Sequence, residues 1–183
     1  MPFEFLKTSI EGVYIIKPKV FEDNRGYFME TFSKDAFSKF INFNVVQENQ
    51  SYSRKGVLRG LHFQKGEYAQ AKLVRVVKGE ILDVAVDIRP DSATFKKYVS
   101  AVLSEKNKQM LYIPRGLAHG FEVLSDEAIV VYLVDNIYKR ESEGGIIWND
   151  KEINIDWPIK DPILSEKDRS WPTLKEYIKG ELS

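Results

Sequence analysis

The chain has two histidines, and imidazole is the side chain best suited to acid–base chemistry near neutral pH. His62 lies in the apolar stretch VLRGLHFQ at residues 57–64, three residues after Arg59. A buried charge is costly unless it is paired, so a strand that only filled a core would have little use for this guanidinium and imidazole. The stretch indicates a functional site. Taken alone, it fits equally well a histidine that is simply accommodated in a strand.

The second histidine, His119, follows a turn in the sequence IPRGLAHGF at residues 113–121. Its Pro-x-Gly-x-x-His spacing resembles the second motif of the cupin barrels, where the histidine is often a metal ligand. A three-histidine metal site cannot be built here, because the chain has two histidines and no cysteine. Two histidines and a carboxylate could still form an iron site, so an iron-dependent cupin oxygenase remains an alternative from these residues.

Composition narrows the class of protein further. A length of 183 residues suits a single domain with a sizeable core. Lys and Arg number 27 and Asp and Glu also number 27, so no overall field exists to recruit nucleic acid or a membrane surface. The absence of cysteine excludes disulfides and thiol nucleophiles. No apolar run approaches the roughly 20 residues of a membrane span, and the first residues lack a secretory pattern, so a cytoplasmic protein is expected.

Short strands separated by turn residues dominate the middle of the chain, and this spacing is typical of a sandwich or barrel. No segment between them has the helical period of a βαβ unit. The pattern predicts a barrel core at about residues 44–134. Its eight strands are expected at 45–52, 57–64, 71–77, 80–88, 97–103, 109–113, 119–123 and 128–134.

The flanking segments differ from this core. Strands are expected near residues 12–17 and 27–32, followed by a short helix from the Ser33 cap to about Ile41. The segment 135–183 carries all three tryptophans and is expected to pack over the barrel, ending in a short helix at residues 171–178.

Polar side chains recur on one face of several predicted strands. Gln47, Asn49 and Ser51 share a face, and so do Asp83 and Asp87. Such a face is more often the solvated side of an antiparallel sheet. In a small barrel, the same alternation points polar groups into a ligand cavity.

Over nearly its full length the chain resembles the dTDP-4-dehydrorhamnose 3,5-epimerase family, a metal-free group with the cupin fold. The motifs that carry the resemblance are Asp23-x-Arg25-Gly26-x-Phe28-x-Glu30, Gln47-x-Asn49, Val57-Leu58-Arg59-Gly60-Leu61-His62-x-Gln64, Tyr68-Ala69-Gln70-x-Lys72, Gly79-Glu80, Val86-Asp87-x-Arg89, Ile113-Pro114-x-Gly116-x-Ala118-His119-Gly120-Phe121, Trp148-Asn149-Asp150 and Leu164-Ser165-x-Lys167-Asp168. Each is weak alone, but nine in register are specific.

The resemblance implies a mainly β protein with a cupin-type double-stranded β-helix (jelly-roll) barrel and short N-terminal and C-terminal helices. Residues 1–183 would form one cupin-like epimerase domain. It further implies a cofactor-independent enzyme that converts dTDP-4-dehydro-6-deoxy-D-glucose to dTDP-4-dehydro-L-rhamnose for rhamnose synthesis. Such an enzyme needs a base, an acid on the opposite face of the sugar, a group that stabilises the enolate, and clamps for the diphosphate.

By the same resemblance, His62 is the base, Asp168 orients it, Tyr132 is the proton donor and Lys72 stabilises the enolate oxygen. His119 is a substrate-binding histidine with Asp83 as its expected partner, and Tyr138 stacks on the thymine. Further substrate contacts are implied for Arg25, Glu30, Gln47, Asn49, Arg59, Glu143 and Lys167.

Arg59 and His62 have opposite parity in a regular strand, so both can face one cavity only if the strand bends or bulges near Gly60. The sequence departs from the family's usual pattern at Lys65-Gly66-Glu67 and at Lys139-Arg140, close to the expected nucleotide site.

Relatives that epimerise only C3 or only C5 share most of these residues, so a monofunctional epimerase is one alternative, and a non-catalytic module that binds sugar nucleotides is another. The presence of both Tyr132 and Tyr138 favours the double epimerase. The family also implies a homodimer, often with an N-terminal strand exchanged, and the apolar edge at residues 13–16 is compatible with this.

Overall fold

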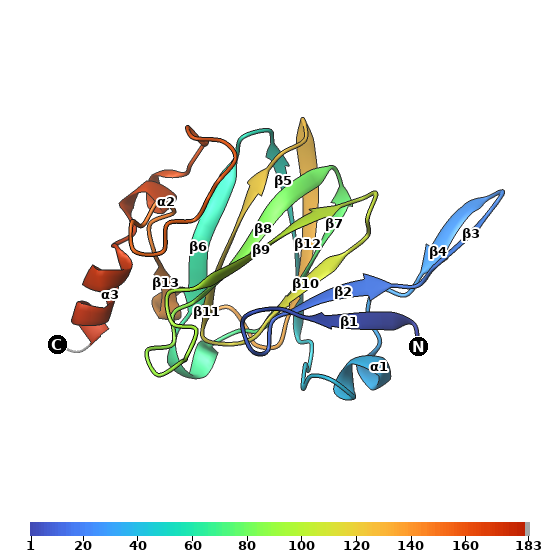
Figure 1. The fold of residues 1–183 in the computed structure, drawn as a ribbon, viewed down its shortest axis with the longest axis horizontal. Helices are drawn as coiled ribbons and strands as arrows, with labels where there is room; N and C mark the ends of the chain where they lie inside the picture. The colour runs from blue at the N-terminus through green and yellow to red at the C-terminus, as the bar shows by residue number, and fades with distance from the viewer. Residues whose placement is uncertain (182–183) are drawn as a thin grey trace.

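The computed structural model describes residues 1–181 and shows two antiparallel sheets that face each other (Figure 1). In spatial order, the first sheet contains β1 (Phe3–Lys7), β2 (Tyr14–Pro18), β10 (Met110–Ile113), β7 (Lys72–Lys78), β12 (Glu127–Val134) and β5 (Gln47–Arg54). The second contains β13 (Glu143–Gly145), β6 (Leu58–Gln64), β11 (Leu117–Val123), β8 (Glu80–Asp87) and β9 (Tyr98–Ser104). The mainly β architecture of the cupin type is confirmed.

The main core lies between the two sheets and follows from strand alternation. On β8, Ile81 and Ala85 point into this core, where Val74 of β7 and Leu111 of β10 meet them. Every second residue from Leu82 to Val86 faces the other way and lies in a second apolar cluster. Since β8 is covered on both sides, apolar residues occur on both of its faces rather than at every second position only.

The C-terminal segment covers the outer face of the second sheet. Trp157 and Leu174 are buried in the second cluster, and the segment reaches along the start of β6, where Ile163 forms a parallel bridge with Val57. Two short helices follow, α2 (Glu166–Ser170) and α3 (Leu174–Glu181), both beside β6 in Figure 1. The buried Asp150 carboxylate accepts a hydrogen bond from the amide of Leu174 (2.8 Å), which fixes the start of α3.

At the other end of the molecule, the hairpin of β3 (Val20–Asp23) and β4 (Gly26–Met29) projects away from the sheets (Figure 1). Helix α1 (Lys34–Ser38) follows it, with the Ser33 side chain accepting from the amide of Ala36 as expected of an N-cap. Short 3₁₀ turns lie at Gly66–Tyr68 and Arg140–Ser142. The longest helix described is α3 with eight residues, so none in this part of the chain could span a bilayer.

All eight strands predicted for the core form, and each end lies within two residues of its predicted position. The final helix begins at Leu174 instead of Trp171. The reason is a capping box: the Glu176 carboxylate accepts from the amide of Thr173 (2.9 Å), and the amide of Glu176 donates to the Thr173 hydroxyl (3.3 Å). Helix α1 ends at Ser38, before the expected Ile41.

Candidate active site

His62 of β6 and Asp168 of α2 form the central pair of the site, although 106 residues separate them in the chain. Nε2 of His62 donates to Oδ1 of Asp168 at 2.5 Å, which leaves Nδ1 of the ring with a free lone pair. Ser165 caps α2 and donates its hydroxyl to the second carboxylate oxygen, Oδ2, of Asp168 (2.7 Å). The imidazole is therefore held in one orientation with one basic nitrogen available.

The charge of this pair follows from its surroundings. Burial by itself would raise the pKa of the Asp168 carboxyl, but the hydrogen bond and charge of His62, together with Ser165, hold the pKa below its ordinary value. Asp168 is thus an anion at neutral pH, and it stabilises a proton gained by His62.

A second histidine–carboxylate pair lies beside the first. His119 of β11 is opposite His62 in the β11–β6 ladder, and its Nε2 donates to Oδ1 of the buried Asp83 on β8 (2.7 Å). The predicted partnership of His119 and Asp83 is confirmed. Burial lowers the pKa of His119, more than Asp83 raises it, so this imidazole is neutral near pH 7.

Lys72 of β7 and Tyr132 of β12 stand on the opposite sheet and face the histidines. Burial lowers the pKa of Lys72 to about 8, with Asp83 and Glu143 opposing the shift. Burial also raises the pKa of Tyr132, so its hydroxyl stays protonated over the physiological range. The site therefore pairs a basic nitrogen on one sheet with a cation and a weak acid on the other.

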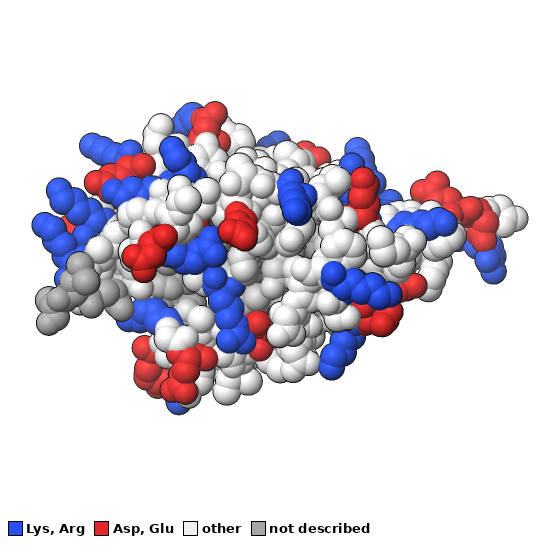
Figure 2. Space-filling model, turned by 60° about the horizontal axis from the view of Figure 1, so that its bottom comes forward, with Lys and Arg blue, Asp and Glu red and all other residues white. Residues whose placement is uncertain are grey.

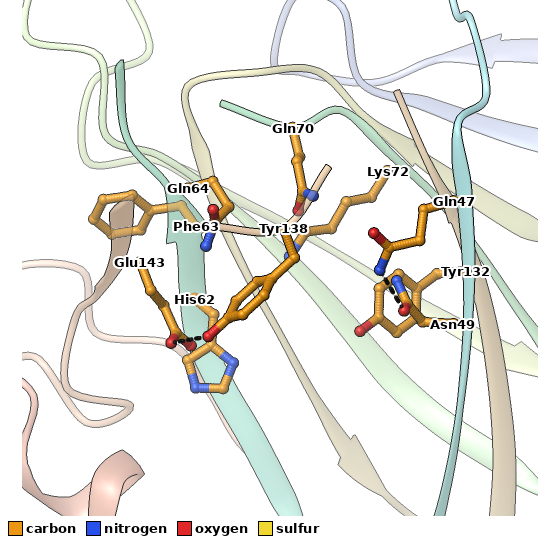
Figure 3. Close-up of a pocket in the computed structure, with 10 residues that line it drawn as sticks. All are labelled: Gln47, Asn49, His62, Phe63, Gln64, Gln70, Lys72, Tyr132, Tyr138 and Glu143. Atoms are coloured by element: carbon orange, nitrogen blue, oxygen red, sulfur yellow. Dashed lines mark hydrogen bonds between the residues drawn. The ribbon is translucent and has the colours of Figure 1, made fainter. Parts of the chain in front are cut away.

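These side chains line two joined hollows that share His62, Lys72 and Tyr132, with volumes of about 260 and 300 Å³. Figure 3 shows the first, with Gln47 and Asn49 entering from β5 on one side and His62 and Glu143 on the other. Of the residues predicted for the site, the first hollow adds Gln47, Asn49, Tyr138 and Glu143, and the second adds Arg59, His119, Lys167 and Asp168.

Arg59 and His62 face the same cavity because β6 is irregular at Gly60. In the β11–β6 ladder, His119 pairs with His62 and Phe121 pairs with Arg59. An advance of two residues on β11 therefore corresponds to an advance of three residues on β6. Gly60 has φ +145°, and a Cβ there would lie 2.5 Å from the Cα of Gly120. The expected bulge near Gly60 is confirmed.

The Arg59 guanidinium is anchored to the neighbouring strand. Its Nε donates to the hydroxyl of Ser53 (2.9 Å), and its Nη2 donates to the carbonyl of Tyr52 (3.2 Å). These bonds leave Nη1 available to an anion in the cavity.

Glu143 binds two of the other predicted substrate-contact residues at the rim of the cavity. Its carboxylate accepts from the Tyr138 hydroxyl (2.9 Å) and from Lys167 Nζ (2.5 Å). Burial would raise the pKa of Glu143, but these two partners hold it below its ordinary value. Tyr138 is half exposed, and its ring stands at the mouth of the hollow in Figure 3.

Several lining residues were not named as site residues from the sequence: Ser51, Phe63, Gln64, Gln70, Phe121 and Ser165. Gln64 accepts a hydrogen bond from the amide of Lys139 (2.9 Å) and so fixes the loop that carries Tyr138. Its position two residues after His62, on the same face of a strand, was the sequence signal that could have found it.

Arg25 and Glu30 lie away from this cavity. Arg25 is on the projecting hairpin, where its side chain is 85% exposed and paired with Asp23. Glu30 is exposed just after β4, and neither residue lines the two hollows. Within one copy of the chain, the structure does not bring these two predicted contacts to the site.

On the face shown in Figure 2, basic and acidic side chains are interspersed. Within residues 1–181, no three His, Cys, Asp or Glu side chains are grouped to hold a metal ion. The two histidines are instead each bonded to a separate carboxylate.

Comparison with known proteins agrees with this geometry. The family model described as dTDP-4-dehydrorhamnose 3,5-epimerase matches residues 7–176. The chain belongs to the dTDP-4-dehydrorhamnose 3,5-epimerase family. The family member from Shigella flexneri is 56% identical over 165 residues, which cover 89% of this chain and 91% of that protein.

Solved structures of the epimerase family superpose over almost the whole chain. The enzyme from Legionella pneumophila, in complex with dTDP-4-keto-L-rhamnose, has 43% identity and a TM-score of 0.93, covering 98% of this chain and 96% of its own. A 3'-monoepimerase from Streptomyces bikiniensis, in complex with dTDP-quinovose, has 32% identity and a TM-score of 0.90, covering 96% and 90%. The same fold thus serves double and single epimerases.

Proposed function

We propose that this protein catalyses the 3,5-epimerisation of dTDP-4-dehydro-6-deoxy-D-glucose to dTDP-4-dehydro-L-rhamnose, in the cytoplasm and without a cofactor. The observation that carries the proposal is the placement of the His62–Asp168 pair and the Tyr132 hydroxyl on opposite sheets around one cavity. Inversion at carbon requires a base and an acid on opposite faces of the sugar ring.

The proposed chemistry uses the acidity of hydrogens next to the 4-keto group. Nδ1 of His62 removes the proton from C3 or C5, and the electron pair moves to the keto oxygen as an enolate. Lys72, the cation of the cavity, stabilises this oxygen. Tyr132 returns a proton to the opposite face of the same carbon, and exchange with solvent restores both residues.

The remaining predicted contacts have geometry suited to a dTDP-linked sugar. Arg59 and Lys167 line the second hollow and supply cations for the diphosphate. Tyr138 at the mouth offers an aromatic face for the thymine, with Gln47, Asn49 and Glu143 as polar neighbours. His119, held neutral by burial, is a hydrogen-bonding group for the sugar.

We further propose a homodimer in which the β3–β4 hairpin of one copy reaches the cavity of the other and supplies Arg25 and Glu30. The hairpin projects from the body (Figure 1) and exposes the large apolar side chains Phe21, Tyr27 and Phe28. Exposed apolar groups gathered on one projecting element are typical of an interaction surface.

Deuterium wash-in tests the reaction. After incubation with dTDP-4-dehydro-6-deoxy-D-glucose in D₂O, we expect mass spectrometry and NMR to show deuterium at both C3 and C5 of the inverted product. His62→Ala should abolish exchange, because the proposed base is lost. Tyr132→Phe should allow exchange but not inversion, because the acid on the other face is lost.

Label at C3 alone or C5 alone would reduce the activity to that of a monofunctional epimerase. Binding of the substrate without any exchange in the unmodified protein would overturn the proposed reaction and leave a binding module. Tyr98→Phe, a tyrosine outside both hollows, serves as the matched control for Tyr132→Phe and should exchange and invert normally.

A further inference from the structure

Strand β5 carries a row of four polar side chains, and the first three of them line the two hollows. Gln47, Asn49, Ser51 and Ser53 occupy every second position and therefore share a face. Gln47 Nε2 donates to Oδ1 of Asn49 (2.8 Å), and Ser53 accepts from Arg59 (2.9 Å). Ser51 differs from the other three: within the described residues, its buried hydroxyl has no hydrogen-bonding partner.

A buried hydroxyl without a partner is costly, and a ligand that supplies one regains that free energy. Ser51 lines the second hollow together with Arg59, His62, Lys72 and Tyr132. It therefore lies where the sugar end of the substrate is bound under the proposed function, on which this inference rests.

Strand register locates Ser51 along the substrate. In the β12–β5 ladder, Asn49 is opposite Tyr132, the proposed acid. Two residues beyond Ser51, Ser53 holds Arg59, the proposed diphosphate clamp. Ser51 is thus one strand repeat, about 7 Å, from the position that faces the reacting carbons and one repeat from the position that faces the phosphates.

We propose that the Ser51 hydroxyl is a specificity-determining contact to the C2 hydroxyl of the hexose. The diphosphate is attached at C1, and C3 and C5 are the carbons that invert. The C2 hydroxyl therefore lies between the diphosphate and the nearer reacting carbon, just as Ser51 lies between the strand positions that face them. A serine hydroxyl can both donate to and accept from a sugar hydroxyl. Because the configuration at C2 does not change, this contact persists through both inversions and holds the ring while the reacting carbons move.

Binding of unreactive ligands tests the contact separately from catalysis. Calorimetry would compare dTDP-D-glucose, dTDP-2-deoxy-D-glucose and dTDP, none of which carries a 4-keto group. The unmodified protein is expected to bind the 2-deoxy ligand about tenfold more weakly than dTDP-D-glucose. Ser51→Ala should lose about the same factor for dTDP-D-glucose, and it should bind the 2-deoxy ligand and dTDP within about twofold of the unmodified protein.

Ser53→Ala is the matched control on the same strand face. It removes the partner of Arg59 instead of a sugar contact, so it should weaken all three ligands, dTDP included, by a similar factor. If Ser51→Ala weakens the 2-deoxy ligand as much as dTDP-D-glucose, the C2 assignment is wrong. Equal affinity of the unmodified protein for the two sugars also overturns it, and that comparison needs no variant. Neither result bears on the wash-in experiment, so this inference and the proposed function can fail independently.

Discussion

Lys72 shows how burial tunes a single residue for its proposed task. Its amine lies among His62, His119 and Tyr132, and its pKa of about 8 leaves it mostly protonated at neutral pH. A lysine in water keeps its proton until about pH 10. The buried amine is therefore a cation that is weakly solvated and so interacts strongly with an enolate, at the cost of losing its charge at mildly alkaline pH.

The pH profile of kcat/KM is expected to report the loss of the Lys72 charge. Activity should fall as pH rises through about 8, because the deprotonated amine no longer stabilises the enolate. Lys72→Arg keeps its proton throughout, so its profile should lack this alkaline limb, at a maximum roughly 10²-fold lower because the charge is displaced. Stopped or coupled assays between pH 6 and 9.5 would measure both. If both proteins showed the same alkaline limb, the group that titrates would be one other than Lys72.

For individual residues, the sequence motifs predicted the two histidine–carboxylate pairs, but they did not show which polar groups lack a partner in the folded chain. The contacts of His62 with Asp168 and of His119 with Asp83 were both expected, and both form. Ser51 was recognised only as part of a polar face, because whether a hydroxyl is already paired depends on the tertiary structure around it. The proposed catalytic roles of these residues remain predictions.

Among the elements, β6 depends most on a local irregularity. A regular strand would turn Arg59 away from His62, and the bulge at Gly60 returns both to the cavity. The backbone of Gly120 lies so close that no side chain fits at Gly60. Site geometry and strand pairing therefore rest on the same glycine.

Gly60→Ala should lower the free energy of unfolding by about 3 kcal/mol or more and abolish epimerisation, since both φ and the contact with Gly120 oppose a methyl group. Gly66→Ala is the control: φ is also positive, at +57°, but nothing lies within 4 Å of the added Cβ, so a cost of about 1 to 2 kcal/mol is expected. Urea unfolding with activity assays would compare them. Similar losses in both variants would contradict the role given to close packing.

The alternation of apolar and polar residues explains why the eight core strands were predictable. An element without this alternation, such as β13, could not be predicted from the sequence. β13 contains Glu143, Gly144 and Gly145, which have no β pattern of their own; they are a strand because β6 pairs with them. A Cβ at Gly145 would lie 2.3 Å from the Trp171 ring, so the glycine there serves packing. Only the folded chain shows such partners.

For the whole molecule, the separation of Arg25 and Glu30 from the other site residues is the feature that calls for a second copy. The two strands of the hairpin that carries Arg25 pair only with each other, and the hairpin projects away from the two sheets (Figure 1). In the proposed twofold dimer, each cavity would receive the hairpin of the other copy.

Mixing two defective proteins tests this arrangement. Arg25→Ala and His62→Ala homodimers should each have little activity. Heterodimers purified with two tags should recover about half the activity of the unmodified dimer, because one of their two cavities has both His62 and an intact hairpin from the other copy. No recovery in heterodimers, or a monomer in sedimentation at micromolar concentration, would refute the exchange.

The C-terminal segment that brings Asp168 to His62 also holds every tryptophan of the chain: Trp148, Trp157 and Trp171. The ring of Trp171 lies 6.1 Å from that of His62, while both sheets of the barrel are free of tryptophan. Intrinsic emission excited at the red edge therefore reports the docking of this segment, and circular dichroism reports the barrel. In a refolding experiment, the two signals separate formation of the fold from formation of the His62–Asp168 pair.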